Sequence, residues 1–513
     1  MIPSNPFLSA TLEQVPRLLG QLNRNLGSRT YGSFDRAYWH YRTNDISCAR
    51  YQEAVLTLAL LYTSDFAGNI YYHDDQILDW IRASLRFTAS LQRSDGSFDE
   101  WYPNEGSYVG TAFATAALGQ TVSLLKAAAV SVSELSLITK TIKRAAVWLT
   151  QAEEATVMNQ VAGAIFALAI AARVTGESQF DEAARQLEKR LLAEQNREGW
   201  WPEYGGPDIG YLSLAVSYLE KYQRLTGSQP VAAAILKAKT FVETFVNPDR
   251  TAGGEYMTRN TEYLIPSITL PYLEAIKPGY LDDRYLCYIL YNWIETGLQL
   301  MPQTIKLFPG EDCFPESKIL RVVNQRYFLV ANGQKGGSLR LYAASQVYYD
   351  SGLELDWHGC RLSSGLFDPQ NAAVFGDNSL AVSGFFKPIK EPLMKTKLAV
   401  PFKLSQLIFG RFSFYQKLIK RFLRPRMISY REPSPVGFER QIIYKPNQIE
   451  IRDTIKAAVN KNQVYRGLKA SYLAVPSSKY FIESELAKNR LEPVESIQEK
   501  PDALVITRSF KFN

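Results

Sequence analysis

The chain has 513 residues, of which 46% are hydrophobic and 21% are charged, a balance that excludes an intrinsically disordered protein. This length exceeds what one hydrophobic core usually holds, so we expect two domains. The net charge of +7 comes from one block, Lys387 to Arg426, which holds eleven basic residues and the single acid Glu391. Since the rest of the chain is slightly acidic, the basic pI gives no reason to expect a nucleic-acid partner.

The N-terminal segment and the cysteines indicate an intracellular protein. Residues 1–29 have no basic stretch followed by a continuous apolar core, so we expect no signal peptide. No apolar run reaches the length of about 18 residues that suggests a membrane span. The 4 cysteines lack CxxC spacing and the chain has only 3 histidines, so we expect reduced thiols and no metal site. These features predict a cytoplasmic protein.

Residues from about 10 to 305 carry the apolar periodicity of helices, with capping residues near the expected ends. Two of these helices end in the same phrase, VTG at 174–176 and LTG at 225–227, where glycine can adopt the left-handed C-cap conformation. The clearest helical ranges are 49–64, 74–92, 108–126, 159–176 and 210–227.

A glycine-aromatic loop recurs between these helices. GSFD stands at 32–35 and again at 96–99, and QRSDGSF at 92–98 has an echo in QNREGWW at 195–201. GGEY at 253–256 is a fourth relative. Each loop follows one helix and precedes another, which predicts stacked helical hairpins with their loops at one end. Such helix pairs can close into an α/α toroid whose loops line one concave face.

The pattern changes after about Pro309 to short runs of alternating apolar and polar residues, separated by Asn/Gly or Pro turns. Such runs predict antiparallel strands that form a β-sandwich. We therefore predict an α+β multidomain fold, with an N-terminal α/α toroid over 1–305 and a C-terminal antiparallel β-sandwich over 306–513. The clearest strands are expected at 326–332, 338–343, 437–445 and 448–455.

The loops also carry polar and aromatic residues suited to binding sugar rings, because Tyr and Trp offer flat apolar faces with polar edges. For Phe34, Phe98 and Trp201 the alternative is packing at the hairpin ends. The substrate-binding candidates of these loops are Trp101, Tyr102, Asn104, Trp200, Trp201, Tyr204 and His40.

A helical toroid followed by a sandwich resembles the heparinase II/III-like polysaccharide lyases, and the resemblance covers most of the chain. Members carry an Asn-His or similar pair at a helix start, which NQVAGA at 159–164 matches. Tyr211 falls at a suitable distance for their tyrosine, and His358 is the one histidine of the second domain. GGEYMTRNTEYL at 253–264 looks like a family loop that contributes Arg259 and Asn260.

The resemblance implies cleavage next to a uronic acid by β-elimination, with no cofactor. The proton at C5 becomes acidic only when the adjacent carboxylate is neutralised. Asn159 and Gln160 would donate amide hydrogen bonds to it, Arg259 would form a bidentate pair, and Asn260 would also bind substrate. Tyr211 would serve as base, acid or both, with His358 as its partner. Gln160 departs from the family's histidine and cannot exchange a proton near neutral pH.

Other interpretations of these residues remain open. Asn159 could be an N-cap, Tyr211 and His358 could pack inside their domains, and Arg259 could pair with Glu255 or Glu262. A glycoside hydrolase on the same toroid would need two carboxylates across the bond. A non-catalytic acidic-polysaccharide-binding protein of polysaccharide biosynthesis or export is favoured by Gln160 and by the absence of an export signal. The hydrolase candidates are Asp95, Asp99, Glu105, Glu203 and Asp208.

The segment Lys403 to Arg426 interrupts the strand pattern. Placed on a helix, its apolar residues fall along one side and its basic residues lie largely elsewhere, as in helices that lie on anionic membranes. The alternative is a helical insertion that packs on the protein's own sandwich. The basic amphipathic interpretation predicts that this segment binds an anionic membrane surface. The protein would then be peripheral to the inner membrane and close to polysaccharide synthesis.

Overall fold

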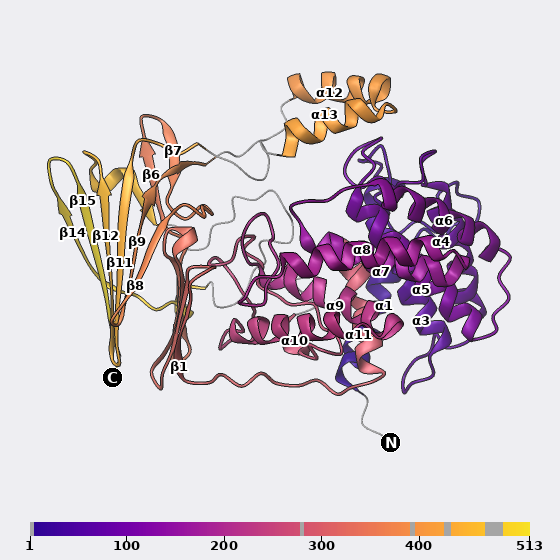
Figure 1. The fold of residues 1–513 in the computed structure, drawn as a ribbon, viewed down its shortest axis with the longest axis horizontal. Coiled ribbons are helices and arrows are strands. Elements are labelled where there is room, and N and C mark those ends of the chain that lie inside the picture. The colour runs from indigo at the N-terminus through magenta and orange to yellow at the C-terminus, as the bar shows by residue number, and fades with distance from the viewer. Residues whose placement is uncertain (1–4, 277–281, 390–395, 425–431, 467–485, 513) are drawn as a thin grey trace.

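The computed structural model describes residues 5–276, 282–389, 396–424, 432–466 and 486–512. These residues form an α+β fold in which a helical region comes first along the chain and three antiparallel sheets follow, with a helical insertion over residues 396–424. Figure 1 shows the helices gathered on one side of the molecule and the sheets on the other.

The inner helices of the helical region are apolar on nearly every side. Neighbours contact one another in the order α3, α5, α7, α9, and α11 contacts α3. The hydroxyl of Ser217 on α9 donates to Asn292 Oδ1 on α11 at 2.9 Å, which closes the ring. The inner helices are α3 (Ala54–Thr63), α5 (Tyr108–Ala127), α7 (Met158–Thr175), α9 (Ile209–Thr226) and α11 (Asp283–Gly297).

The outer helices are amphipathic, with one buried face turned toward the ring. They are α1 (Pro6–Gln21), α4 (Asp75–Ser90), α6 (Leu135–Gln151), α8 (Ser178–Glu194) and α10 (Gln229–Thr244), with the short helices α2 (Arg36–Trp39), η1 (Ala49–Glu53) and η2 (Leu273–Ala275) between them. Among the described residues, only α7 is long and apolar enough to cross a membrane, and 78% of it is buried inside the protein, as expected of a core helix.

The glycine-aromatic loops are built alike. Gly96 has φ 96°, and a Cβ there would lie 2.4 Å from the carbonyl oxygen of Arg144 on α6. Gly32 approaches Ala83 on α4 and Gly199 approaches Lys237 on α10 in the same way, also with positive φ. Only glycine fits where a positive φ and a touching backbone coincide. The repeated phrase therefore marks the point where each loop docks on the next outer helix.

The aromatic residues that follow these glycines are core residues. Phe34 and Phe98 are fully buried, and Trp201 is nearly so. The Trp201 indole N–H donates to the carbonyl of Leu191 at 2.8 Å, and the neighbouring Trp200 indole donates to Glu198 at 2.9 Å. The rings of the two tryptophans are thus enclosed and their polar edges are bonded within the protein, an arrangement that favours packing.

The strands in the described part of the chain form three sheets. The first has the order β1-β2-β3-β4-β5, the second β10-β7-β6-β13 and the third β14-β15-β12-β11-β9-β8. Their ranges are β1 (Gly310–Phe314), β2 (Ile319–Val323), β3 (Tyr327–Asn332), β4 (Ser338–Ala343), β5 (Gln346–Asp350), β6 (Leu353–Trp357), β7 (Cys360–Ser363), β8 (Ala372–Gly376), β9 (Ser379–Phe385), β10 (Lys387–Pro388), β11 (Gly437–Lys445), β12 (Gln448–Lys456), β13 (Val464–Arg466), β14 (Val494–Glu499) and β15 (Leu504–Lys511), with η4 (Gly333–Lys335), η6 (Lys461–Gln463) and η9 (Ala487–Asn489).

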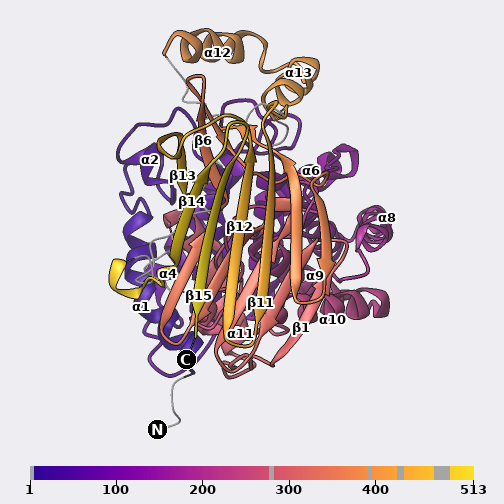
Figure 2. The same ribbon diagram turned by 90° about the vertical axis from the view of Figure 1, so that its left-hand side faces the viewer.

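One apolar core joins the sheets, and a buried ion cluster links the first sheet to the third. Arg440 on β11 bonds Asp453 on β12 at 2.6 Å and Asp350 on β5 at 3.1 Å. Arg508 on β15 bonds the same two carboxylates. Each charge is paired, as burial requires. Figure 2 shows the third sheet face-on, with the helices behind it.

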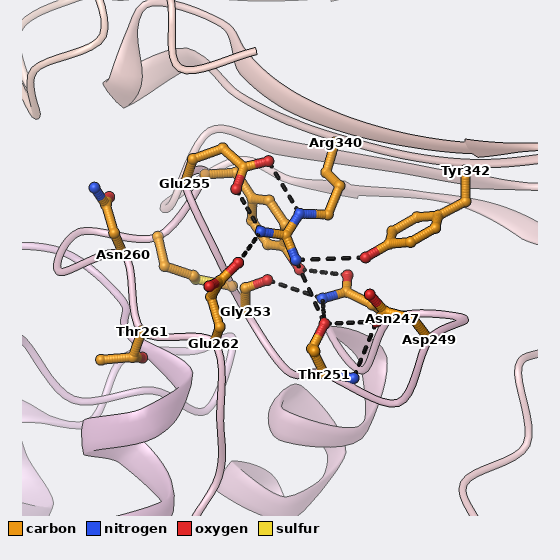
Figure 3. Close-up of polar contacts among 12 residues, drawn as sticks. Asn247, Asp249, Thr251, Gly253, Glu255, Asn260, Thr261, Glu262, Arg340 and Tyr342 are labelled. Atoms are coloured by element: carbon orange, nitrogen blue, oxygen red, sulfur yellow. Dashed lines mark hydrogen bonds and ion pairs between the residues drawn. The ribbon is translucent and has the colours of Figure 1, made fainter. Parts of the chain in front are cut away.

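The helical region and the first sheet meet at a second buried ion cluster, drawn in Figure 3. Arg340 on β4 is fully buried and donates to both oxygens of Glu255 and to one oxygen of Glu262. The Asn332 side chain donates to the backbone carbonyl of Tyr256 at 2.7 Å. The loop 253–262 is thereby held between the two regions.

The basic segment is two helices, α12 (Thr396–Phe409) and α13 (Ser413–Arg424), and not the single helix over 403–426 that we expected. Gly410 ends the first helix, and the Phe412 backbone N–H donates to the Phe409 carbonyl at 2.9 Å in the turn. Residues 425 and 426 lie outside the described residues. Figures 1 and 2 show the hairpin standing apart from the sheets, over the edge of the helical region.

Candidate functional site

Three loops at one end of the inner helices are joined by backbone hydrogen bonds. The Tyr204 N–H donates to the Thr156 carbonyl at 3.0 Å, and the Thr258 N–H donates to the Pro207 carbonyl at 3.0 Å. The loop before α7, the loop before α9 and the loop 253–262 thus form one unit. They bring together four of the residues that the sequence selects: Asn159, Tyr204, Tyr211 and Arg259.

Asn159 is the second residue of α7, and Val157 is the N-cap. Its side chain is 4% exposed and donates to Glu203 Oε2 at 2.7 Å. The N-cap interpretation is therefore wrong, since the amide reaches across to another loop. Gln160, the next residue, is half-buried, and its backbone N–H donates to the Val157 carbonyl.

Glu203, which the sequence offered only as a candidate for hydrolysis, lies in this site next to Asn159. Burial raises the pKa of its carboxyl to about 8, against the lowering effect of Arg259 and Asn159. The group is therefore largely protonated at neutral pH and can donate a hydrogen bond. Its Oε1 is buried and has no hydrogen-bond partner among the described residues. A buried, unpaired carboxyl oxygen is costly unless a ligand contacts it.

Arg259 is buried beside this carboxyl. Its guanidinium carbon lies 4.3 Å from the centre of the Tyr204 ring, and its Nε has no hydrogen-bond partner within the described ranges. Burial lowers the pKa of Arg259. The nearby Tyr211, Tyr204 and Glu203 raise it by more, so the guanidinium is charged. The alternative partners Glu255 and Glu262 are bonded to Arg340 instead. Arg259 is thus a buried cation with capacity to bind an anion.

Asp208 positions Tyr211 and Arg259 together. It is the N-cap of α9, where its Oδ1 accepts from the Tyr211 N–H at 3.3 Å. Its Oδ2 accepts from the Arg259 N–H at 3.0 Å. Tyr211 lies in the first turn of α9 and is half-buried. A single capping carboxylate therefore sets the backbone of both residues.

Asn260 connects the site to the first sheet. It has a positive φ of 57°, and its side-chain oxygen accepts from the buried Lys335 ammonium, which also donates to the Met257 carbonyl at 3.0 Å. Burial lowers the pKa of Lys335 to about 8. Lys335 comes from η4, between β3 and β4, so the β region contributes a cation to the loop that carries Arg259.

A second group of candidates lies on the loop Asp99–Ser107. Trp101 is 57% exposed, and the Arg284 guanidinium carbon lies 4.8 Å from the centre of its ring. Arg284 is paired with the buried Glu100 at 2.7 Å. The Tyr102 ring lies 5.6 Å from that of Phe402 on α12, and Asn104 accepts from Arg93 at 2.9 Å. Trp101 is the exposed aromatic surface of this loop.

The two histidine candidates lie elsewhere. His358 is exposed in the turn between β6 and β7, has a positive φ of 52° and has its ring 4.6 Å from that of Trp357. No interaction in the described part of the chain joins it to Tyr211. His40 is the exposed C-cap of α2, with its ring 5.2 Å from Trp39 and 4.9 Å from Tyr41.

Most of the carboxylates considered for hydrolysis hold loop backbone. Asp99 accepts from the N–H groups of Asn104 and Gly106, and Glu105 from those of Glu100 and Trp101. Asp95 accepts from Ser97, and Asp208 is the cap described above. These groups act as turn acceptors. Glu203 differs in having a buried oxygen without a hydrogen-bond partner among the described residues.

The fold is similar to that of a chondroitin AC lyase from Streptomyces coelicolor A3 in complex with chondroitin sulphate, with a TM-score of 0.56 and 8% identity over 99% of this chain and 78% of that one. A mutant of the lyase from the same source, with tyrosine replaced by alanine, gives a TM-score of 0.53 and 9% identity over 89% and 67%. A heparinase III gives 0.48 and 10% over 100% and 83%.

No family model and no curated protein sequence matches the chain. At identities near 10%, the likeness to the chondroitin lyase structures concerns the fold. The molecule therefore has a polysaccharide-lyase-like α+β fold, which confirms the general part of the resemblance seen in the sequence.

Proposed function

We propose that this protein is a polysaccharide lyase that cleaves a uronic-acid-containing polysaccharide by β-elimination at Asn159, Glu203, Tyr211 and Arg259. The observation that carries the proposal is a pair of buried atoms with no hydrogen-bond partner in the described part of the chain, Glu203 Oε1 and Arg259 Nε, close to Asn159 and Tyr211. Proteins of similar fold include one whose structure holds chondroitin sulphate, an acidic polysaccharide.

The first requirement of elimination is to neutralise the uronate carboxylate. Arg259 supplies a fixed positive charge, and the protonated Glu203 supplies a hydrogen bond. Asn159 holds Glu203 through its amide, so it acts here as a positioning residue. Charge that develops on the carboxylate oxygens as the C5 proton leaves is stabilised by these donors.

Tyr211 then performs the proton transfers. Its phenolate removes the C5 proton, the electron pair forms the C4–C5 double bond, and the C4–O bond breaks. The departing oxygen takes a proton from the Tyr211 hydroxyl, so the residue returns to its starting form. The products are an unsaturated uronate and a new chain end, and no water or cofactor is consumed. Gln160 and His358 take no part in this scheme.

The test is the ultraviolet absorbance of the unsaturated uronate, with purified protein and a panel of acidic polysaccharides. Tyr211→Phe should lower turnover by about 10²–10⁴-fold, the usual contribution of acid–base catalysis. Tyr72→Phe, at a partly exposed tyrosine outside the site, should leave turnover unchanged. Thermal unfolding of both variants shows whether the fold is kept. Full turnover in Tyr211→Phe would refute the assignment.

A second candidate function is non-catalytic binding of the acidic polysaccharide. Two observations favour it: Gln160 stands where the resemblance implies histidine, and His358 is exposed at a hairpin turn. Affinity electrophoresis separates the two functions, because a binding protein would be retarded by the polymer while releasing no unsaturated product.

The proposal includes the domain organisation and the location expected from the sequence. The helical ring is an α/α toroid within residues 1–305, and the sheets form a sandwich domain within 306–513.

The protein works in the cytoplasm, peripheral to the inner membrane. Free thiols at all 4 cysteines support this location. Fractionation of cells that express the tagged chain tests it, and recovery outside the cytoplasmic membrane and cytosol would overturn it.

A further inference from the structure

The helical hairpin α12–α13 exposes apolar side chains to an unusual degree. Leu407 is 73% exposed and Phe414 65%, and Leu398, Leu404, Ile408 and Phe412 are exposed as well. Among the described side chains of residues 396–424, only Gln406 and Gly410 are buried. Contiguous exposed apolar residues on a folded protein mark a surface that another body covers.

The charge of the hairpin indicates which kind of partner covers it. The sequence from Thr396 to Arg424 contains no Asp or Glu. Lys397, Lys403, Arg411 and Arg421 are exposed among the apolar residues. Apolar side chains interleaved with Lys and Arg are complementary to a surface that is apolar inside and anionic outside.

The lengths of the helices determine how they would meet such a surface. α12 has 14 residues and α13 has 12, while crossing a bilayer takes about 20 apolar residues. Each helix can therefore lie along the interface, with its apolar side chains in the acyl region and its basic side chains among the head groups.

The hairpin is tied to the helical region at the loop Asp99–Ser107. The Phe402 ring lies against Tyr102, and Asn104 Nδ2 lies 3.5 Å from the Gln406 carbonyl. Lys403 forms an ion pair with Asp45 at 3.4 Å. A body that binds the hairpin is therefore held next to Trp101, the exposed aromatic residue of the same loop.

We propose that α12–α13 is an interfacial anchor that docks the protein on an anionic lipid bilayer, with the loop Asp99–Ser107 facing the membrane. This docking goes beyond the proposed elimination and does not depend on it, because the hairpin residues take no part in the chemistry. A soluble acidic polymer would be attracted by the basic residues alone, whereas the bilayer also accounts for the exposed Leu407, Ile408 and Phe414.

Vesicle flotation tests the anchor, with the full chain and vesicles of phosphatidylcholine mixed equally with phosphatidylglycerol. The wild type should float with these vesicles and remain at the bottom with pure phosphatidylcholine. The double variant Leu407→Asp/Phe414→Asp should lose flotation. The triple variant Lys397→Glu/Arg411→Glu/Arg421→Glu should bind more than about a hundred-fold more weakly, since the loss of each basic residue near an anionic surface costs roughly five-fold and each glutamate adds repulsion.

Matched controls lie on the outer helices. Leu236→Asp changes a residue of α10 that is 62% exposed, and Arg185→Glu/Lys189→Glu/Lys237→Glu reverses three exposed charges on α8 and α10. Both should float like the wild type. Failure of the wild type to float would overturn the proposal, as would flotation of the Leu407→Asp/Phe414→Asp variant. Binding to a soluble acidic polysaccharide that depends on the hairpin, without flotation, would assign the surface to the polymer instead.

Discussion

Arg340 and Arg259 are two buried arginines that meet the same loop, 253–262, and they differ in how their charge is satisfied. Arg340 enters from β4 and is bonded to Glu255 and Glu262. Arg259 belongs to the loop itself, lies between these two acids in sequence, and has an Nε with no hydrogen-bond partner among the described residues. One loop thus supplies two carboxylates to a cation from the other region and carries a buried cation of its own beside Glu203 and Tyr204.

This difference distinguishes an arginine that stabilises the fold, Arg340, from an arginine that can bind a ligand, Arg259. A buried cation with its carboxylates in place links two regions, and removal of one partner leaves uncompensated charge. A buried cation with an unbonded donor, beside a protonated acid, keeps its capacity for a ligand. This contrast gives predictions in which the two arginines behave in opposite ways.

The largest effect on stability is expected at Arg340. Arg340→Met should lower the free energy of unfolding by about 3–5 kcal/mol, because Glu255 and Glu262 would remain buried without a cation. Chemical denaturation measures this loss. Adding Glu255→Gln and Glu262→Gln to the same variant should recover much of it. A loss under about 1 kcal/mol, typical of exposed pairs, would contradict the structural role.

Arg259→Met should show the reverse pattern. Turnover should fall by about 10²–10³-fold, the usual contribution of one group that stabilises developing charge. The free energy of unfolding should change by less than about 2 kcal/mol, because the folded chain loses mainly the contact with the Tyr204 ring. Steady-state kinetics and denaturation on one preparation give both numbers. Lower stability with unchanged turnover would make Arg259 a structural residue like Arg340.

Glu203→Gln gives the smallest effect, a change in pH dependence. Burial raises the pKa of Glu203 from 4.5 to about 8, so the folded protein holds this proton more tightly than the unfolded chain does. The contribution of Glu203 to the free energy of unfolding is fully present below pH 4.5 and is lost as the pH rises through about 8.

Wild-type kcat/KM should decline above about pH 8, where Glu203 loses the proton that it donates. The amide of the Glu203→Gln variant donates at every pH, so this variant should keep its activity at neutral pH and show no such decline. A pH–rate profile of kcat/KM compares the two proteins. Asp95→Asn, at a carboxylate that holds its own turn, is the control and should keep the wild-type profile. An unchanged alkaline limb in Glu203→Gln would exclude Glu203 as the donor.

The sequence predicted the order of helices before strands, and the repeated GSFD phrase correctly marked one kind of loop, because glycine and helix periodicity are local signals. The partners of the site residues were harder to predict. Glu203 meets Asn159 from 44 positions away, and Lys335 reaches Asn260 from another region. Such pairs depend on how loops are stacked, and no local pattern records that.

Aromatic residues illustrate the same limit. Trp101 and Trp201 follow similar glycine phrases, yet one is 57% exposed and the other 3%. The difference arises from position in the loop, since Trp201 comes two residues after its glycine and Trp101 comes five after. Composition alone does not distinguish a packed ring from an open one.

The glycine docking points also divide each loop into a part that is constrained and a part that is free to vary. Gly96 and Gly199 are fixed by contact with the neighbouring helix, and Gln92 and Gln195 donate to these glycines in the same way. Beyond the docking point the two loops differ in length and content. Within residues 100–106, Glu100 is tied to α11 through Arg284 and Glu105 holds the loop backbone, so a change confined to the exposed Trp101 would leave the ring of helices as it is.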